Sequence, residues 1–270
     1  MLIIIMKALG AIIAICLVLL LVQNSRIEKF TKQKKVIISM TTIPTRIDNV
    51  NEVCQGYLNQ SRMPDEIHLN IPHVFKRNNT EYDISRINVS DERVKIHRCE
   101  DMGPMTKIFP TVEREFHNQN SEDIVILYCD DDVVPPHDFV ERYMKEHEKE
   151  EKSVIFSWCG DNLYQSPEDP KSRGCRLPEA FQGVLLPLSA IDDLGDFTAH
   201  VKFSLQNSNC FRGDDYVLAD YYTKMGIPRR QLEKPYDMGG VKHIDGKDAL
   251  SSGDGITRDR YKGCIEHLKR

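Results

Sequence analysis

The chain has 270 residues and a formal net charge of −5, from 36 basic and 41 acidic side chains. Hydrophobic residues make up 40% of the chain and charged residues 29%, a composition typical of globular proteins rather than of disordered or fibrous ones. A protein that binds nucleic acid without sequence preference needs a basic face. The acidic balance therefore argues against nucleic acid as a partner.

The first 22 residues are predicted to form a transmembrane signal-anchor. Met1–Val22 contains one charged residue, Lys7, and a spanning helix needs about 20 apolar residues. Lys7 lies near one end, where its side chain can reach the membrane interface. A cleaved signal peptide is the alternative, but no A-x-A-like site follows the apolar run. We expect an uncleaved anchor over residues 1–22 and a short basic stem over residues 23–35.

The orientation of this anchor has two interpretations. The basic residues of the stem outnumber those before the anchor, so the positive-inside rule keeps the rest of the chain in the cytosol. N-glycosylation sequons at Asn78 and Asn88 favour a secretory lumen instead. We predict a single-pass type II protein of the Golgi or endoplasmic reticulum, with the cytosolic face of a membrane as the alternative.

The eight cysteines do not decide the compartment. The sequence has no C-x-x-C pair, which excludes a zinc ribbon and a thioredoxin-type motif. Seven cysteines follow the predicted anchor, so one stays unpaired even in an oxidising lumen, and the pairing is left open. Cys54 and Cys129 lie in apolar patterns and are predicted to be small core residues.

The first part of the remaining chain has the pattern of a βαβ unit. Val36–Met40 is a continuous apolar run, as expected of a buried parallel strand. Apolar residues at helical spacing follow between Val50 and Leu58. Glu66–Ile71 is a second predicted strand, and Val94–His97 a third. Strand, helix and strand in this order favour a parallel pair with a crossover helix.

The next segments continue the alternation. A helix is predicted over Met105–Phe116, in which Pro110 is tolerated only if it lies in the first turn. Ile124–Tyr128 is the strongest strand pattern in the chain. Asp138 and Glu141 have the spacing of a capping box, which predicts the start of another helix.

The last predicted elements complete the fold class. Val154–Trp158 is a further strand, and Val217–Met225 is a helix closed by Gly226. Alternating strands and helices favour an α/β fold, in which a mostly parallel central sheet is flanked by helices. We expect a single domain over residues 36–270.

The most informative chemical signal is the triplet Asp130-Asp131-Asp132. It follows a buried strand, and ligands of open α/β sheets bind outside the carboxyl ends of the strands. Three adjacent carboxylates repel one another, and Mg²⁺ or Mn²⁺ can share them and bridge to substrate phosphates. A solvated acidic turn is the alternative. A phosphatase of the haloacid dehalogenase type is disfavoured, because Val134 or Pro135 occupies the place of its threonine.

Four segments in order resemble GT-A-fold D-x-D glycosyltransferases: Val36–Arg46, Gly103–Lys107, Tyr128–Asp132 and Gly213–Asp215. More narrowly, they resemble small membrane-anchored sugar transferases with a T-x-I-P-x-R first loop. The resemblance implies a GT-A-like fold with a nucleotide-binding half and an acceptor-binding half. It also implies transfer of a sugar from a nucleotide diphosphate, most of all a UDP-sugar, to a glycan or glycoconjugate hydroxyl, with Mn²⁺ or Mg²⁺.

The resemblance also implies a donor and metal site. Arg46 could fork onto a phosphate, with a surface ion pair as the alternative. Lys107 opens a predicted helix, where anions are favoured, with a solvated lysine as the alternative. Asp130 and Asp132 would frame the metal, and His243 would complete its shell unless it is merely structural. The donor-binding residues by position are Thr41, Thr42, Arg46, Thr106, Lys107, Asp130 and Asp131.

Asp214 and Asp215 are the candidate catalytic residues. A helix N-terminus keeps carboxylates ionised, which a general base needs, although N-capping is a competing role for the same residues. We expect Asp214 to cap the helix and Asp215 to be the base. Contacts to acceptor and donor sugar are implied for Trp158, Asp161 and Gln182. Burial in the core is an equal alternative for Trp158.

The sequence therefore predicts a membrane-anchored, metal-dependent glycosyltransferase that inverts configuration by direct displacement. Two alternatives stay open. One is a membrane-anchored carbohydrate-binding or scaffold protein without turnover. The other is a nucleotidyltransferase, which also brings acidic residues and a cation to a nucleotide. The tail after Pro235 matches no motif of the resembled family.

Overall fold

The computed structural model describes residues 15–17, 34–160, 177–236, 242–244 and 256–269. The chain divides into two units, Met1–Lys34 and Lys35–Arg270. In the first unit, residues 15–17 are helical, with Ile15 and Leu17 exposed. The rest of the predicted anchor and nearly all of the stem lie outside the described residues. Within the described ranges, no helix is long and apolar enough to cross a membrane, so the anchor stays a prediction.

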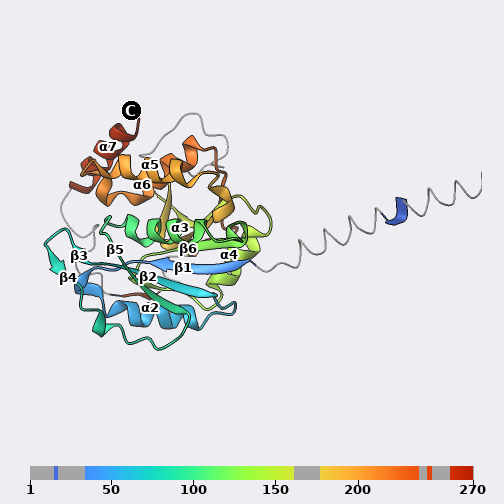
Figure 1. Cartoon of the computed structure of the whole chain (residues 1–270), viewed down its shortest axis with the longest axis horizontal. Coiled ribbons are helices and arrows are strands. Elements are labelled where there is room, and N and C mark those ends of the chain that lie inside the picture. The colour runs from blue at the N-terminus through green and yellow to red at the C-terminus, as the bar shows by residue number, and fades with distance from the viewer. Residues whose placement is uncertain (1–14, 18–33, 161–176, 237–241, 245–255, 270) are drawn as a thin grey trace, which may run out of the picture. The chain divides into compact units, whose positions relative to one another are not determined.

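The second unit is built on a seven-stranded mixed sheet (Figure 1). β9 runs antiparallel to β6 and β8, whereas the other neighbouring strands are parallel. The α/β class and the mostly parallel sheet are therefore confirmed. In spatial order the strands are β10 (Arg229–Gln231), β8 (Val154–Cys159), β9 (Pro178–Pro187), β6 (Ile124–Tyr128), β1 (Lys35–Met40), β2 (Glu66–Pro72) and β5 (Val94–Cys99).

The helices cover both faces of this sheet, which explains why its central strands β1 and β6 are almost entirely buried. In Figure 1, α2 lies on one side of the sheet, and α5, α6 and α7 lie on the other. α2 (Asn49–Leu58) and α4 (Phe139–His147) contribute to one core cluster. The second cluster contains residues of α3 (Phe109–Phe116), α5 (Leu194–Leu205), α6 (Asp214–Lys224) and α7 (Ile256–Leu268).

Short elements lie between these strands and helices. β3 (Val74–Phe75) and β4 (Thr80–Glu81) form a hairpin, and β7 (Val133–Val134) pairs with β11 (Lys242–His243). The 3-10 turns are η1 (Pro44–Arg46), η2 (Ile84–Arg86), η3 (Met105–Lys107), η4 (Ser121–Asp123), η5 (Leu188–Ala190) and η6 (Cys210–Arg212).

Strand register determines where the loops meet. Ser39 of β1 lies opposite Tyr128 of β6 in a parallel pair, so both strands end at the same edge of the sheet. The segments that follow them, 41–46 and 129–132, therefore start side by side. Both strands are almost entirely buried. Long apolar runs thus place two polar loops at one edge, as the sequence predicts.

Several local predictions need correction. The helix expected over Met105–Phe116 divides into η3 and α3, although Pro110 does lie in the first turn of α3. Asp138 precedes α4 without a side-chain capping bond within the described part of the chain. Glu141 accepts a hydrogen bond from Ser61 (2.7 Å) instead, so the capping box is wrong.

The end of α6 shows one success and one error. Gly226 has a φ of 62°, a left-handed conformation that glycine tolerates and that closes the helix as predicted. Met225 follows the last helical residue and is exposed, so it does not extend the buried face. Cys54 and Cys129 are buried, which confirms them as core residues.

Candidate functional site

A cavity of about 930 Å³ opens at the carboxyl ends of the parallel strands. Its walls come from the segments after β1, β2, β5 and β6, from the start of α6 and from β11. The sequence-predicted site residues that line it are Thr41, Thr42, Arg46, Lys107, Asp130, Asp131, Asp132, Asp214, Asp215 and His243. Residues from distant parts of the chain therefore meet in one space.

The middle residue of the acidic triplet anchors the loop. Asp131 is 1% exposed, accepts a hydrogen bond from the Thr42 hydroxyl, and has its Oδ1 2.8 Å from Nη2 of Arg46. Burial raises the pKa of Asp131 to about 7, because it outweighs the opposing effects of Arg46 and Thr42. Thr42 and Arg46 thus hold the buried side chain of Asp131, and these contacts fix the position of the whole triplet.

The outer two carboxylates are more accessible and line the cavity. Nη1 of Arg46 lies 3.0 Å from Oδ2 of Asp132. Burial and the neighbouring Asp130 raise the pKa of Asp132 despite the guanidinium of Arg46. The mutual repulsion expected of adjacent carboxylates is therefore present. Arg46 binds carboxylates rather than lying in a surface ion pair, and its contact with a donor phosphate stays a prediction.

Lys107 connects the acidic triplet to the start of α6. Its Nζ contacts Oδ1 of Asp130 and lies 3.0 Å from Oδ2 of Asp214. Burial lowers the pKa of Lys107, but Asp130, Asp214 and Asp215 outweigh burial and leave the pKa well above its ordinary value. The Ser39 hydroxyl donates to the backbone carbonyl of Lys107. Lys107 is therefore a buried, charged bridge and not a solvated lysine.

The two aspartates of α6 have different surroundings. Gly213 is the N-cap, and the Asp214 carboxylate turns toward Lys107, so the predicted capping role of Asp214 is wrong. Oδ1 of Asp215 accepts a hydrogen bond from the Ala180 N–H at 3.3 Å. Burial, and then the charge of Asp214, raise the pKa of Asp215 well above its ordinary value. The raised pKa differs from the expectation that a helix N-terminus keeps this carboxylate ionised.

His243 reaches the cavity through an unexpected strand. β11 pairs antiparallel with β7, so His243 lies opposite Val133, directly after the acidic triplet. The backbone N–H of Ile244 donates to the Asp132 carbonyl at 2.8 Å. His243 is exposed and lines the same cavity as Asp130 and Asp132. Two carboxylates and one imidazole are ligand types that suit Mn²⁺. In the described residues, the ligand atoms of Asp130, Asp132 and His243 do not all lie within 4.8 Å of one another.

Another His and Glu group lies away from the cavity. Within the described ranges, Glu66, His68 and Glu115 are the group whose ligand atoms all lie within 4.8 Å of one another. The Lys35 ammonium already lies 3.2 Å from Glu66 and 3.4 Å from Glu115. Nη2 of Arg114 is 3.0 Å from Nδ1 of His68. Nε2 of His68 lies 2.6 Å from Glu66, so both ring nitrogens have protein partners, and we assign no metal to this group.

Three predicted site residues are not among the described residues that line the cavity. Thr106 is buried, and its hydroxyl accepts from the backbone N–H of Met102 at 2.9 Å. Trp158 packs edge-on against Phe181, with ring centroids 5.6 Å apart. Gln182 is buried and accepts from the Ser157 hydroxyl at 2.9 Å. All three support the framework beside the cavity. Asp161 lies outside the described residues.

Sequence reasoning missed several wall residues. Phe75 and Tyr82 come from the β3–β4 hairpin region and stack edge-on, with centroids 6.3 Å apart. Tyr216 of α6 and Tyr261 of α7 also line the cavity, with ring centroids 4.7 Å apart. Glu179 of β9 also lines the cavity. The aromatic residue directly after Asp215 was a usable signal, whereas the others depend on tertiary packing.

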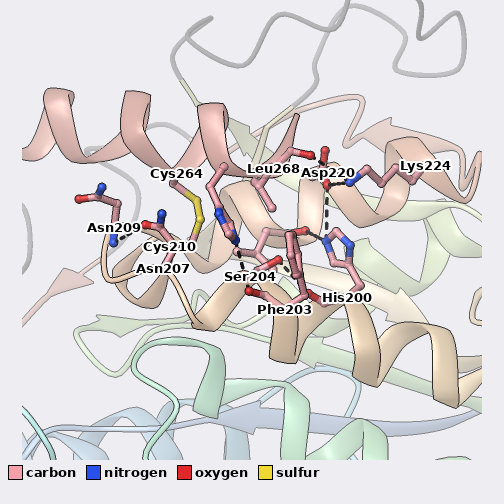
Figure 2. Close-up of a disulfide and its surroundings, with 12 residues drawn as sticks. His200, Phe203, Ser204, Asn207, Asn209, Cys210, Asp220, Lys224, Cys264 and Leu268 are labelled. Carbon is pink, nitrogen blue, oxygen red and sulfur yellow. Dashed lines mark hydrogen bonds and ion pairs between the residues drawn. A yellow bond between two sulfur atoms is a disulfide. The ribbon is translucent and has the colours of Figure 1, made fainter. Parts of the chain in front are cut away.

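A disulfide attaches α7 to the turn before α6. Figure 2 shows Cys210, in the turn before α6, joined to Cys264 of α7. On the same layer, Asp220 of α6 lies 2.9 Å from Nζ of Lys224 and 3.6 Å from Nε2 of His200 in α5 (Figure 2). The disulfide holds Tyr261 on the cavity wall and supports the turn that leads to Asp214.

No protein-family model and no curated protein matches the chain. Solved structures of LgtC match most of the chain at low identity. An active-site mutant of LgtC has 9% identity and a TM-score of 0.45, covering 84% of this chain and 95% of that chain. Galactosyltransferase LgtC with donor and acceptor sugar analogs has 7% identity and a TM-score of 0.46, covering 87% and 95%.

Proposed function

We propose that this protein is a metal-dependent glycosyltransferase that moves a sugar from a nucleotide diphosphate, most of all a UDP-sugar, to a hydroxyl of a glycan or glycoconjugate. One observation carries the proposal: Asp130 and Asp132 line the same cavity as Asp215. The first two carboxylates suit a divalent cation on a diphosphate, and the third suits proton transfer. One cavity therefore offers both functions that the reaction needs.

The donor side is formed by the acidic triplet and its neighbours. Asp130, Asp132 and His243 would hold Mn²⁺ or Mg²⁺, which would neutralise charge on the diphosphate leaving group. Asp131 fixes the triplet through its contacts with Thr42 and Arg46. Lys76 and Arg77, both exposed, also line the cavity and give its rim positive charge that attracts an anionic donor.

The acceptor side is formed by the start of α6 and by α7. The acceptor oxygen would form a bond to the anomeric carbon while the bond from that carbon to the diphosphate oxygen breaks. Asp215 would take the proton of the hydroxyl, and the displacement would invert configuration. Tyr216 and Tyr261 offer aromatic surface in the same wall, on which sugar rings can pack.

Turnover assays on the full-length protein separate this proposal from its alternatives. Nucleoside diphosphate released from a panel of nucleotide sugars with Mn²⁺ supports a glycosyltransferase. Pyrophosphate released from nucleoside triphosphates supports a nucleotidyltransferase. Binding of saccharides without turnover supports a carbohydrate-binding or scaffold protein. The anomeric configuration of the product, measured by NMR, tests inversion.

Asp132→Ala is expected to abolish both Mn²⁺ binding and nucleoside diphosphate release, and EDTA should do the same to the wild type. The melting temperature should change little, because the substitution removes one of three repelling carboxylates and Arg46 keeps Asp131 as a partner. The exposed Asp192, which lies outside the cavity wall, provides the matched control Asp192→Ala. Turnover by Asp132→Ala, or full turnover in EDTA, would contradict the metal assignment.

A further inference from the structure

Lys107 occupies an unusual position for a lysine in a cation-binding cavity. Its side chain is 5% exposed, and its ammonium lies between Asp130 and Asp214. These carboxylates belong to different elements, since Asp130 follows β6 and Asp214 begins α6. A positive charge of the protein itself therefore already lies beside a carboxylate that we assign to the metal.

Both backbone polar groups of Lys107 are hydrogen-bonded, which fixes the position of the residue. Its backbone N–H donates to the Pro104 carbonyl at 3.0 Å, and its carbonyl accepts from Ser39, so η3 holds the residue. The neighbouring Asp131 and Asp132 have Arg46 as their cation. Lys107 is thus the protein cation assigned to Asp130 and Asp214, whereas Arg46 serves the rest of the triplet.

We propose that Lys107 is a positioning residue that competes with the divalent cation for Asp130 and keeps the metal affinity low until the donor diphosphate is present. This inference rests on the proposed function. An ammonium and a divalent cation on one carboxylate repel each other at short range. A bound diphosphate adds negative charge that can accept a hydrogen bond from Lys107 and offset this repulsion. Metal and donor binding are then coupled through one side chain.

Lys107→Gln tests the proposal through Mn²⁺ binding, measured by electron paramagnetic resonance or calorimetry without nucleotide. The glutamine amide can still donate to a carboxylate but carries no charge. We expect Mn²⁺ to bind about tenfold more tightly to Lys107→Gln than to the wild type, because a like charge is removed. A purely structural role for Lys107 would instead weaken Mn²⁺ binding when the residue is changed.

Two further variants control for charge and for folding. Lys107→Arg keeps the charge and is expected to keep Mn²⁺ affinity near that of the wild type. Lys95→Met removes an exposed lysine of β5 that does not line the cavity, and it should leave Mn²⁺ affinity nearly unchanged. If Lys107→Gln does not fold, as judged by circular dichroism, Lys107→Met provides the same loss of charge, with an apolar stem in the buried site.

Coupling gives a second readout. Adding UDP should raise the Mn²⁺ affinity of the wild type by a larger factor than that of Lys107→Gln, because the variant has no ammonium to neutralise. Unchanged or weaker Mn²⁺ binding by a folded, uncharged variant would overturn the inference and leave the proposed function standing. A wild type that binds no Mn²⁺ at all, with or without UDP, would overturn both.

Discussion

At the scale of single residues, the three consecutive carboxylates of the acidic loop have different partners. Asp131 is buried against Thr42 and Arg46, Asp130 contacts Lys107, and Asp132 shares Arg46. The sequence predicts that such a triplet needs positive charge nearby. It does not predict that the protein supplies part of that charge, because the two cations come from segments far from the triplet and only tertiary structure brings them together.

The proposed role of Asp215 as the general base can be tested by substitution. We expect Asp215→Asn to keep Mn²⁺ and donor binding but to lose about 10²–10⁴-fold in turnover, the usual contribution of a general base. Turnover of the wild type should fall as the pH is lowered. Because the pKa of Asp215 is raised, this loss should begin at a higher pH than an ordinary aspartate would give. Initial rates measured over a range of pH give both the turnover of the variant and the pH dependence of the wild type. Normal turnover by Asp215→Asn would show that another residue is the base.

Asp214→Asn is the comparison for this variant, because it changes the adjacent carboxylate in the same helix turn. Asp214 is an ion-pair partner of buried Lys107 at 3.0 Å. Removing one partner of a buried pair costs about 3–5 kcal/mol, so we expect mainly a lower melting temperature. A loss of turnover larger than that of Asp215→Asn, at unchanged stability, would exchange the two roles.

At the scale of elements, strands buried on both faces were predictable and the elements that complete the cavity were not. Val36–Met40 and Ile124–Tyr128 are continuous apolar runs because helices cover both faces of the sheet. β9 is not predicted from the sequence, because it starts at a proline and contains a glycine, and both residues are uncommon in strands. Gly183 has a φ of 83° and lies beside the ring of Phe139. α7 is also not predicted from the sequence, because its residues are largely polar, although Cys264 is fully buried.

The Cys210–Cys264 disulfide is the element-scale contact with the largest expected effect. It closes a loop with a sequence separation of 54, for which chain-entropy arguments give about 4 kcal/mol of stabilisation. We expect the double variant Cys210→Ser/Cys264→Ser to lose stability of this order in denaturant unfolding. Its turnover should also fall, because the turn before Asp214 and the helix that carries Tyr261 lose their covalent link.

Cys99→Ser is the matched control, since Cys99 is a free, half-buried cysteine outside this contact. Its unfolding midpoint should stay close to that of the wild type, and it should respond to dithiothreitol as the wild type does. The double variant should not respond to dithiothreitol through this bond. Equal stability of the double variant and the wild type under non-reducing conditions would show that packing alone holds α7.

At the scale of the whole molecule, the disulfides bear on the compartment. Cys159 is disulfide-bonded in addition to Cys210 and Cys264. Structural disulfides form in oxidising environments and are rare in the cytosol. They favour the lumenal alternative over the cytosolic one that the positive-inside rule supports. We therefore propose that the folded unit lies in the secretory lumen and follows an N-terminal membrane anchor in the sequence.

Glycosylation tests this orientation on the full-length protein. Asn78 and Asn88 are exposed, and Asn59-Gln60-Ser61 is a third sequon, also with an exposed asparagine. A lumenal unit presents these side chains to the glycosylation machinery, whereas a cytosolic one does not. We expect endoglycosidase to increase the gel mobility of protein made in secretory cells.

The asparagine variants identify the modified sites. Changing all three sequon asparagines to glutamine should abolish the mobility shift. A single variant should reduce the shift by the contribution of one glycan if its asparagine is glycosylated. Asn118→Gln changes an exposed asparagine outside any sequon and should leave the shift intact. An absent shift, together with digestion by protease added outside sealed membranes, would instead place the cavity in the cytosol. The disulfides would then need an oxidant in that compartment.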